Sequence, residues 1–199
     1  MFDRFAIAGA TPFLTAARTY LRPPQANDWS EWAELRTESR EFLKPWEPTW
    51  PADALSRTAF RRRLRLYARD AREDVGYGFL IFRRGDDSLL GGITLSNVRR
   101  GVSQCCSVGY WIGKPYARQG YMTDALPAVI RFVFEDLALR RLEAACLPGN
   151  EPSQKLLLST GFAREGFARQ YLCIDGVWQD HVLFGLLSRD PWRRGGPAL

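Results

Sequence analysis

Three short apolar segments in the middle of the chain have the side-chain pattern of β-strands. They are residues 77–82 (YGFLIF), 89–95 (LLGGITL) and 107–112 (SVGYWI). The first two are joined by RRGDDS, in which Gly and Asp tolerate the backbone angles of a tight turn. The pattern predicts an antiparallel meander at the centre of the domain.

Apolar residues at helical spacing flank this meander. Residues 29–43 and 55–70 are predicted to be helices, and the segment between them a rigid loop, because it contains Pro45, Pro48 and Pro51. Residues 121–137 also have helical spacing, but Pro127 removes one backbone donor. We expect either a bend in the first turns of this helix or a later start.

The remaining segments alternate strand, helix and hairpin. A strand at 141–147 is followed by a helix at 153–160, which Gly161 ends, and by a hairpin of 168–174 and 177–187 around Asp175-Gly176. This order predicts a single α+β domain with a mixed, mostly antiparallel sheet over residues 1–188. Residues 189–199, with two prolines and two glycines, are expected to be a loose tail.

Composition narrows the class of protein. The chain has 199 residues, 46% of them hydrophobic and 25% charged, as in an ordinary globular protein. No apolar run reaches the eighteen or so residues of a membrane span, and residues 1–10 lack the apolar stretch of a secretory signal. We expect a cytoplasmic protein without a membrane partner.

The cysteines and the single histidine do not suggest a metal centre. Cys105, Cys106, Cys146 and Cys173 include no CxxC pair, and the adjacent two could not bridge each other without strain. Reduced thiols and no metal are therefore expected. His181 falls in an alternating strand segment, which favours a structural or surface residue over a catalytic base.

A net charge of +6 favours anionic partners, such as nucleic acid, a ribosome surface or a phosphate-bearing cofactor. The densest basic segment is Arg57–Arg72, which has apolar residues at helical spacing and arginines elsewhere. It is either a solvated amphipathic helix or a docking surface for RNA or an acidic partner.

Two segments could bind a phosphate-bearing ligand. Residues 107–126 (SVGYWIGKPYARQGYMTDAL) run from a strand through a loop into a helix, so that free amides meet near Gly120, where backbone can approach a ligand closely. Asn150-Glu151-Pro152-Ser153 opens the next helix. Each segment alone also fits an ordinary helix start or cap.

A series of short motifs extends in order over residues 15–187. It comprises LRP at 21–23, FLKPWEP at 42–48, GGI at 91–93, GYWI at 109–112, RQGYMTDAL at 118–126, NEPS at 150–153, GF at 161–162, EGFA at 165–168 and IDGVWQDH at 174–181. Together these motifs resemble the GNAT superfamily of acyl-CoA N-acyltransferases, in particular ribosomal-protein-alanine N-acetyltransferases of the RimJ/RimL type. The superfamily has a pyrophosphate signature, Q/R-x-x-G-x-G/A, and this chain has its central glycine at Gly120. At the first and last specified positions it has Ala117 and Met122 instead of the expected residues. Backbone amides of residues 118–122 can still form the cradle.

The resemblance implies the GNAT fold, acetyl-CoA as co-substrate and a set of coenzyme contacts. These are Tyr110, Trp111, Ile112, Arg118, Gln119, Gly120, Tyr121, Met122, Thr123, Asn150 and Ser153. The strand with Tyr110 would pair with the pantetheine arm and present an amide to the thioester oxygen. Asn150 would hold the arm, and Ser153 would be either the general acid for the leaving thiolate or a plain helix cap.

The general base is harder to assign. An α-amine, with a pKa of about 7.7 to 8.0, needs only a weak base. Some relatives carry a carboxylate where this chain has Leu172, so our candidate is Glu47 in the proline-rich loop, which could otherwise be a solvated loop acid. Trp46 and Trp50 are expected to anchor that loop or to line the cleft.

The predicted function is direct transfer of an acetyl group from acetyl-CoA to the N-terminal α-amine of a protein, such as a ribosomal protein. The same fold could serve a small-molecule acceptor, namely a polyamine, an amino acid or an aminoglycoside. A non-catalytic acyl-CoA-binding or ribosome-binding module is a third alternative. A monomer and a homodimer are both compatible with the sequence.

Overall fold

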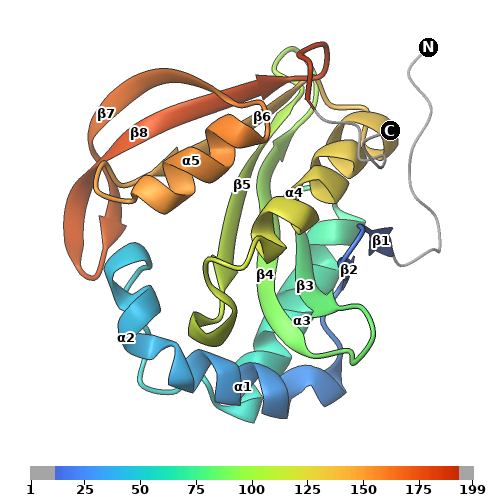
Figure 1. Cartoon of the computed structure of the whole chain (residues 1–199), viewed down its shortest axis with the longest axis vertical. Helices are drawn as coiled ribbons and strands as arrows, with labels where there is room; N and C mark the ends of the chain where they lie inside the picture. Colours follow the sequence, from blue (N-terminus) through green and yellow to red (C-terminus); the bar gives the residue numbers. More distant parts are fainter. Residues whose placement is uncertain (1–11, 193–199) are drawn as a thin grey trace.

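The computed structural model describes residues 12–192, which contain one eight-stranded sheet in the order β1-β2-β3-β4-β5-β6-β8-β7 (Figure 1). The strands are β1 (Leu14–Thr15), β2 (Thr19–Arg22), β3 (Tyr77–Arg83), β4 (Leu89–Arg99), β5 (Cys105–Ile112), β6 (Arg141–Cys146), β7 (Ala163–Ile174) and β8 (Val177–Leu187). Only β5 and β6 pair in parallel; the other neighbours are antiparallel. The predicted fold class is confirmed.

Helices cover both faces of this sheet. They are α1 (Trp29–Glu38), α2 (Arg40–Leu43), α3 (Arg57–Arg72), α4 (Tyr121–Arg131) and α5 (Glu151–Ser159), with short 3-10 turns at Ala26–Asp28, Lys44–Trp46 and Lys114–Tyr116. In Figure 1, α4 and α5 lie in front of the sheet and α3 lies behind β3 and β4. The sheet is therefore the middle layer of three.

Two apolar clusters hold these layers together. The larger lies beneath α4 and α5 and includes Leu126 and Val129 of α4 packed with Phe184 of β8. The smaller joins Trp32 of α1 and Phe60 of α3 to β3 and β4. Because it is covered on both faces, β3 is buried at six successive positions and reads as a continuous apolar run.

The predicted helix at 29–43 is interrupted. The Ser39 side chain is fully buried, and its hydroxyl accepts a hydrogen bond of 2.8 Å from the backbone N–H of Lys114. The chain leaves helical geometry at Ser39, where α1 ends and α2 begins. The break thus fixes α2 beside the end of β5.

The helix that contains Pro127 also differs from expectation. It begins at Tyr121 and continues through the proline to Arg131, and a π-helical turn follows at Phe132–Asp136. Pro127 lies at the seventh position of α4, so its missing N–H costs one hydrogen bond within the helix. The irregular turn follows the proline instead of preceding it.

Two further differences lie at the edges of the sheet. Strands β1 and β2 were not predicted, and β7 begins at Ala163, earlier than the expected residue 168. In the segment expected to be a loose tail, Trp192 is buried and its ring lies 5.4 Å from that of Phe134. The remaining tail residues, 193–199, lie outside the described part of the chain.

No helix within residues 12–192 has the length and apolar character needed to cross a membrane.

Candidate active site

The site begins where two parallel strands separate. β5 and β6 are paired only through Cys105, Cys106 and Ser107 of β5. β5 then continues to Ile112 along β4, without further partners on β6. The side of β5 that faces β6 is therefore open at residues 108–112 to an extended ligand that could supply hydrogen bonds in place of a strand.

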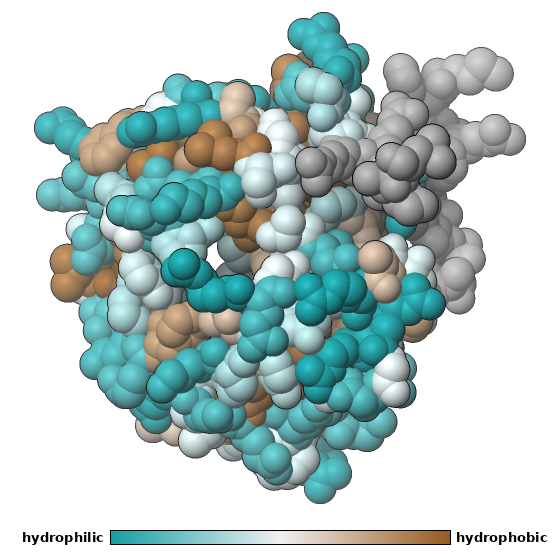
Figure 2. Space-filling view, viewed as in Figure 1, coloured by the Kyte–Doolittle hydropathy of each residue, from teal (hydrophilic) through white to brown (hydrophobic). Residues whose placement is uncertain are grey.

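A cavity of about 880 Å³ occupies this gap, within the size range of small-molecule sites. Figure 2 shows the surface hollowed near the middle of this face. The lining comes from α2 and the following turn (Phe42, Leu43, Trp46, Glu47), from β5 (Tyr110, Trp111, Ile112), from the loop and start of α4 (Tyr116, Ala117, Arg118, Gly120, Tyr121, Met122, Thr123) and from the start of α5 (Gly149, Asn150, Glu151, Pro152, Ser153, Lys155, Leu156, Ser159).

At one side of the cavity the start of α4 forms an anion cradle. Arg118 and Gly120 have positive φ angles of 64° and 80°, and this left-handed geometry turns the chain into the helix at Tyr121. The first amides of α4 have no acceptor within the helix, and the helix dipole adds partial positive charge. These residues fit the pyrophosphate of a coenzyme A.

One predicted coenzyme contact is turned away from this cradle. Gln119 is absent from the cavity lining, because its side chain donates a hydrogen bond of 2.7 Å to the carbonyl of Pro115. Its own carbonyl accepts from the guanidinium of Arg18 at 2.9 Å. Gln119 therefore holds the loop, while all the other predicted contacts line the cavity.

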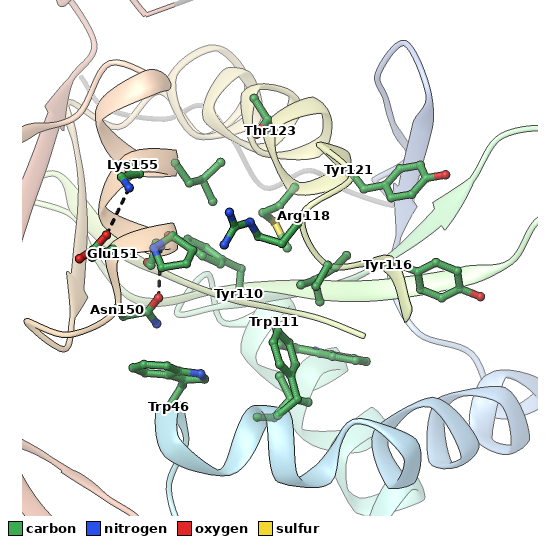
Figure 3. Close-up of a pocket in the computed structure, with 18 of the residues that line it drawn as sticks. Trp46, Tyr110, Trp111, Tyr116, Arg118, Tyr121, Thr123, Asn150, Glu151 and Lys155 are labelled. Atoms are coloured by element: carbon green, nitrogen blue, oxygen red, sulfur yellow. Dashed lines mark hydrogen bonds and ion pairs between the residues drawn. The ribbon is translucent and has the colours of Figure 1, made fainter. Parts of the chain in front are cut away.

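Across the cavity, Ser153 and Asn150 open α5 (Figure 3). Asn150 is the N-cap: its side-chain oxygen accepts from the Ser153 backbone N–H at 3.2 Å. The Ser153 hydroxyl lies instead 2.7 Å from the phenol oxygen of Tyr110. Ser153 is thus not the cap of this helix, and its hydroxyl is available to the cavity.

The groups around Ser153 stay protonated at neutral pH. Burial raises the pKa of Tyr110, although its hydrogen bond to Ser153 acts in the opposite direction. Burial likewise raises the pKa of the Cys146 thiol, again opposed by Ser153. The Tyr110 phenol and the Cys146 thiol beside Ser153 are therefore proton donors.

On the opposite wall, Glu47 is held by three donors. Both guanidinium Nη atoms of Arg36 bind its two carboxylate oxygens, at 2.8 and 2.7 Å, and the Trp50 indole N–H binds at 2.8 Å. Arg36 itself is buried between the rings of Trp50 and Trp111, at 4.2 and 4.7 Å from their centroids. Glu47 lines the cavity, and the alternative of a solvated loop acid is wrong.

The two loop tryptophans have different roles. Trp46 lines the cavity and in Figure 3 lies below Asn150, so it is a wall. Trp50 holds Glu47 and stacks on Arg36, which makes it an anchor. The same loop is tied to the β7–β8 hairpin, because the Asp175 N–H donates to the Glu47 carbonyl at 3.0 Å.

Arg36 is the functional neighbour that the sequence did not suggest. It is one of many arginines on amphipathic helices, and its partner Glu47 lies eleven residues away in a loop.

His181, expected to be structural or at the surface, is a buried residue of β8. Between residues 12 and 192, no three His, Cys, Asp or Glu side chains are grouped to hold a metal ion.

Comparison with known proteins agrees with this geometry. Residues 18–163 match the acetyltransferase (GNAT) domain family. The ribosomal-protein-uS5-alanine N-acetyltransferase of Escherichia coli is 35% identical over 182 residues, which are 92% of this chain and 93% of that protein. The chain belongs to the GNAT family of acetyltransferases.

Two solved structures share the whole architecture. The ribosomal-protein-S5-alanine acetyltransferase of Vibrio fischeri has a TM-score of 0.83 and 27% identity, over 92% of this chain and 99% of that one. Mycobacterium smegmatis RimJ, in complex with CoA-disulfide, has a TM-score of 0.82 and 29% identity, over 89% and 86%. The chain is an N-acetyltransferase that uses acetyl-CoA to acetylate an amine.

Proposed function

We propose that the acceptor is the N-terminal α-amine of a protein, in particular of a ribosomal protein. The observation that carries this proposal is the match to the Escherichia coli enzyme named for an alanine of ribosomal protein uS5, along nearly the full length of both chains. A ribosomal-protein acceptor would place the reaction in the cytoplasm.

The charges of the cavity support a peptide over a polycation. Its lining contains two carboxylates, Glu47 and Glu151, and each is already paired, with Arg36 and with Lys155 respectively. A polyamine or an aminoglycoside would need unpaired acids to replace the hydration of its ammonium groups. A peptide presents one amine and a largely neutral backbone, which this lining fits better.

The proposed mechanism is direct attack of the amine on the thioester, without an acylated enzyme. A nitrogen–carbon bond forms, the carbon–sulfur bond breaks, and an amide N–H of β5 stabilises the oxyanion, an effect of about 3 kcal/mol in other acyl transfers. Ser153 gives its hydroxyl proton to the leaving thiolate. The amine nitrogen loses one proton to solvent as the amide forms, and Tyr110, hydrogen-bonded to Ser153 at 2.7 Å, can relay a proton from solvent back to Ser153.

Glu47 could act in one of two ways, as a general base or as a positioning residue. As a base it would accept a proton from the amine, but protonation would weaken its hydrogen bonds to Arg36 and Trp50. Its geometry therefore favours a positioning role, in which it fixes the wall that carries Trp46 against the β7–β8 hairpin.

We further propose that α3 contacts ribosomal RNA. Its arginines at positions 57, 61, 62, 63, 65, 69 and 72 are all exposed. Among the described residues Arg61, Arg65 and Arg72 have no carboxylate partner. A shallow groove on α3 is lined by Arg62, Arg65, Leu66 and Arg69. Arginines four positions apart, such as Arg65 and Arg69, are separated by about 6 Å along the helix axis.

The RNA contact is tested by salt-dependent binding of ribosomal RNA to the protein and to an Arg61→Gln/Arg65→Gln variant. The variant should bind several-fold more weakly and show a shallower salt dependence, while it acetylates free peptides at an unchanged rate. Equal RNA binding by both proteins contradicts the contact.

The acceptor is tested by coenzyme A thiol release with peptides that begin with Ala, Ser or Met, beside polyamines, amino acids and aminoglycosides. Release that depends on peptides supports the proposal. Release with small amines alone favours the small-molecule alternative, and acetyl-CoA binding without any release favours a binding module.

A further inference from the structure

His181 is a buried ionisable side chain that the mechanism has not used. It is 2% exposed and lies on β8, directly before Val182. Val182, Phe184 and Leu186 face the cluster beneath α4 and α5, so the alternation of a strand directs His181 to the other face of the sheet.

We expect the acceptor to approach the thioester from that second face. Tyr110 packs against the cluster beneath α4 and α5, as does Leu156 of α5, whereas Trp111 packs against the cluster of α1 and α3. Ser153 and the anion cradle therefore serve the first face. Trp111, Arg36 and the loop of Glu47 border the second.

His181 is also close to the gap along the sheet. The last pair between β6 and β8 is Cys146 with Val182, so His181 stands beside the end of the strand that borders the gap. In Figure 1, α3 lies behind β3 and β4, and no helix lies behind β6 and β8. Ala145 and Leu183, paired on this face, are accordingly only half-buried.

The hydrogen bond of the ring selects one tautomer. Nδ1 of His181 lies 2.9 Å from the carbonyl oxygen of Gln179. A carbonyl only accepts, so Nδ1 carries the hydrogen and, in the neutral ring, Nε2 presents its lone pair. Nε2 has no hydrogen-bond partner among residues 12–192. It is not completely buried either, because within these residues Arg36 Nε is the only fully buried side-chain N or O atom without a partner.

An irregular strand fixes the ring from its other side. The pairing of β7 with β8 shifts between Ala168 and Leu172, and Gln170 within this bulge has a φ of 46°. Its N–H is held by the Asp180 carboxylate at 2.8 Å. The bulge brings the Tyr171 ring to 5.8 Å from that of His181 at 66°, and bulges that redirect a side chain recur beside active sites.

We propose that Nε2 of His181 is the general base of the transfer. This inference rests on the proposed acetylation of an amine. Because His181 is not among the residues that line the cavity, the substrate ammonium gives one proton to Nε2 through water, and the neutral amine attacks the thioester carbonyl from the second face. As the amide forms, the nitrogen loses its second proton to solvent, while Ser153 protonates the leaving thiolate on the first face and is reprotonated through Tyr110. His181 then returns its proton to solvent, so that each transfer releases one proton overall.

The test compares kcat and KM of the unmodified protein and of His181→Asn across pH. Asn can keep the bond to the Gln179 carbonyl but has no equivalent of Nε2. We expect kcat at neutral pH to fall about 100-fold with KM little changed. The loss should shrink as pH rises past about 8, because a free α-amine then loses its proton unaided.

A matched variant and a chemical probe separate this role from a structural one. Tyr171→Phe keeps the aromatic ring that packs against His181 but removes its titratable hydroxyl, and it should retain the pH profile of the unmodified protein. Because the chain has a single histidine, diethyl pyrocarbonate should inactivate the unmodified protein, more slowly with acceptor peptide present and reversibly with hydroxylamine.

Three results overturn the inference. One is a loss in His181→Asn that is equal at every pH, another is the pH-dependent loss appearing in Glu47→Gln instead, and the third is no effect of the pyrocarbonate. Failure of the unmodified protein to acetylate any amine would contradict the proposed function itself and the inference with it.

Discussion

The phenol oxygen of Tyr110 and the hydroxyl oxygen of Ser153 are 2.7 Å apart, and the contact joins β5 to α5 across the cavity. Residues 43 positions apart in the sequence thus meet where the thioester sulfur is expected. The contact gives Ser153 both an orientation and a source of protons.

Ser153→Ala should lower kcat about tenfold or more and leave acetyl-CoA affinity nearly unchanged. Tyr110→Phe should cause a smaller loss, since Ser153 remains. The two losses should not add in the double variant, because both act through one hydrogen bond. Steady-state kinetics with calorimetric coenzyme binding measure this, and full additivity would show that the two residues act independently.

Gly120→Val should weaken acetyl-CoA binding by about tenfold or more. Its φ of 80° lies where a side chain costs about 1 to 2 kcal/mol, and relief of that strain would move the cradle amides. Gly101→Val is the matched control, since Gly101 has a φ of 63° at the opposite end of β5. It should lower stability alone, and equal coenzyme affinity in both variants would mean that the cradle is misplaced.

Glu47→Ala should lower the free energy of unfolding by about 3 kcal/mol, because it leaves the buried Arg36 charge without a partner. Glu151→Ala breaks the exposed pair with Lys155 and should cost less than about 1 kcal/mol. Urea unfolding of both variants measures the difference. Equal losses would contradict the anchoring role of the Arg36–Glu47 pair.

The free energy of unfolding should decrease at alkaline pH, in part because the buried Cys106 thiol ionises. Burial raises the pKa of this thiol from 9.0 to about 12, so between these values the folded state binds the proton more tightly than the unfolded state. The stabilisation is complete below the lower value and is lost as pH rises through the window. Burial raises the pKa of Tyr77 as well, so Cys106→Ala should reduce the alkaline slope without removing it. An unchanged slope in urea titrations would contradict this.

The sequence predicted those features whose causes are local. Short apolar runs located β3, β4 and β5, because burial acts over a few residues. The ordered motifs located the cavity through the family resemblance. Ser39 interrupts a helix through Lys114, a partner 75 positions away, and no local pattern contains that bond. The same reason hides the Arg36–Glu47 pair and the hydrogen bond from Arg18 that holds the Gln119 carbonyl. The position of His181 relative to β6 and its tautomer, on which the proposed base role depends, also appear only in the folded sheet.

The most direct test of the account is mass spectrometry of a peptide that has a free N-terminal alanine and an internal lysine, after incubation with the protein and acetyl-CoA. We predict one added acetyl group, located by fragmentation on the α-amine, with one equivalent of free coenzyme A. Acetylation of the lysine alone, or of small amines but not of this peptide, would contradict the proposed N-terminal acetyltransferase.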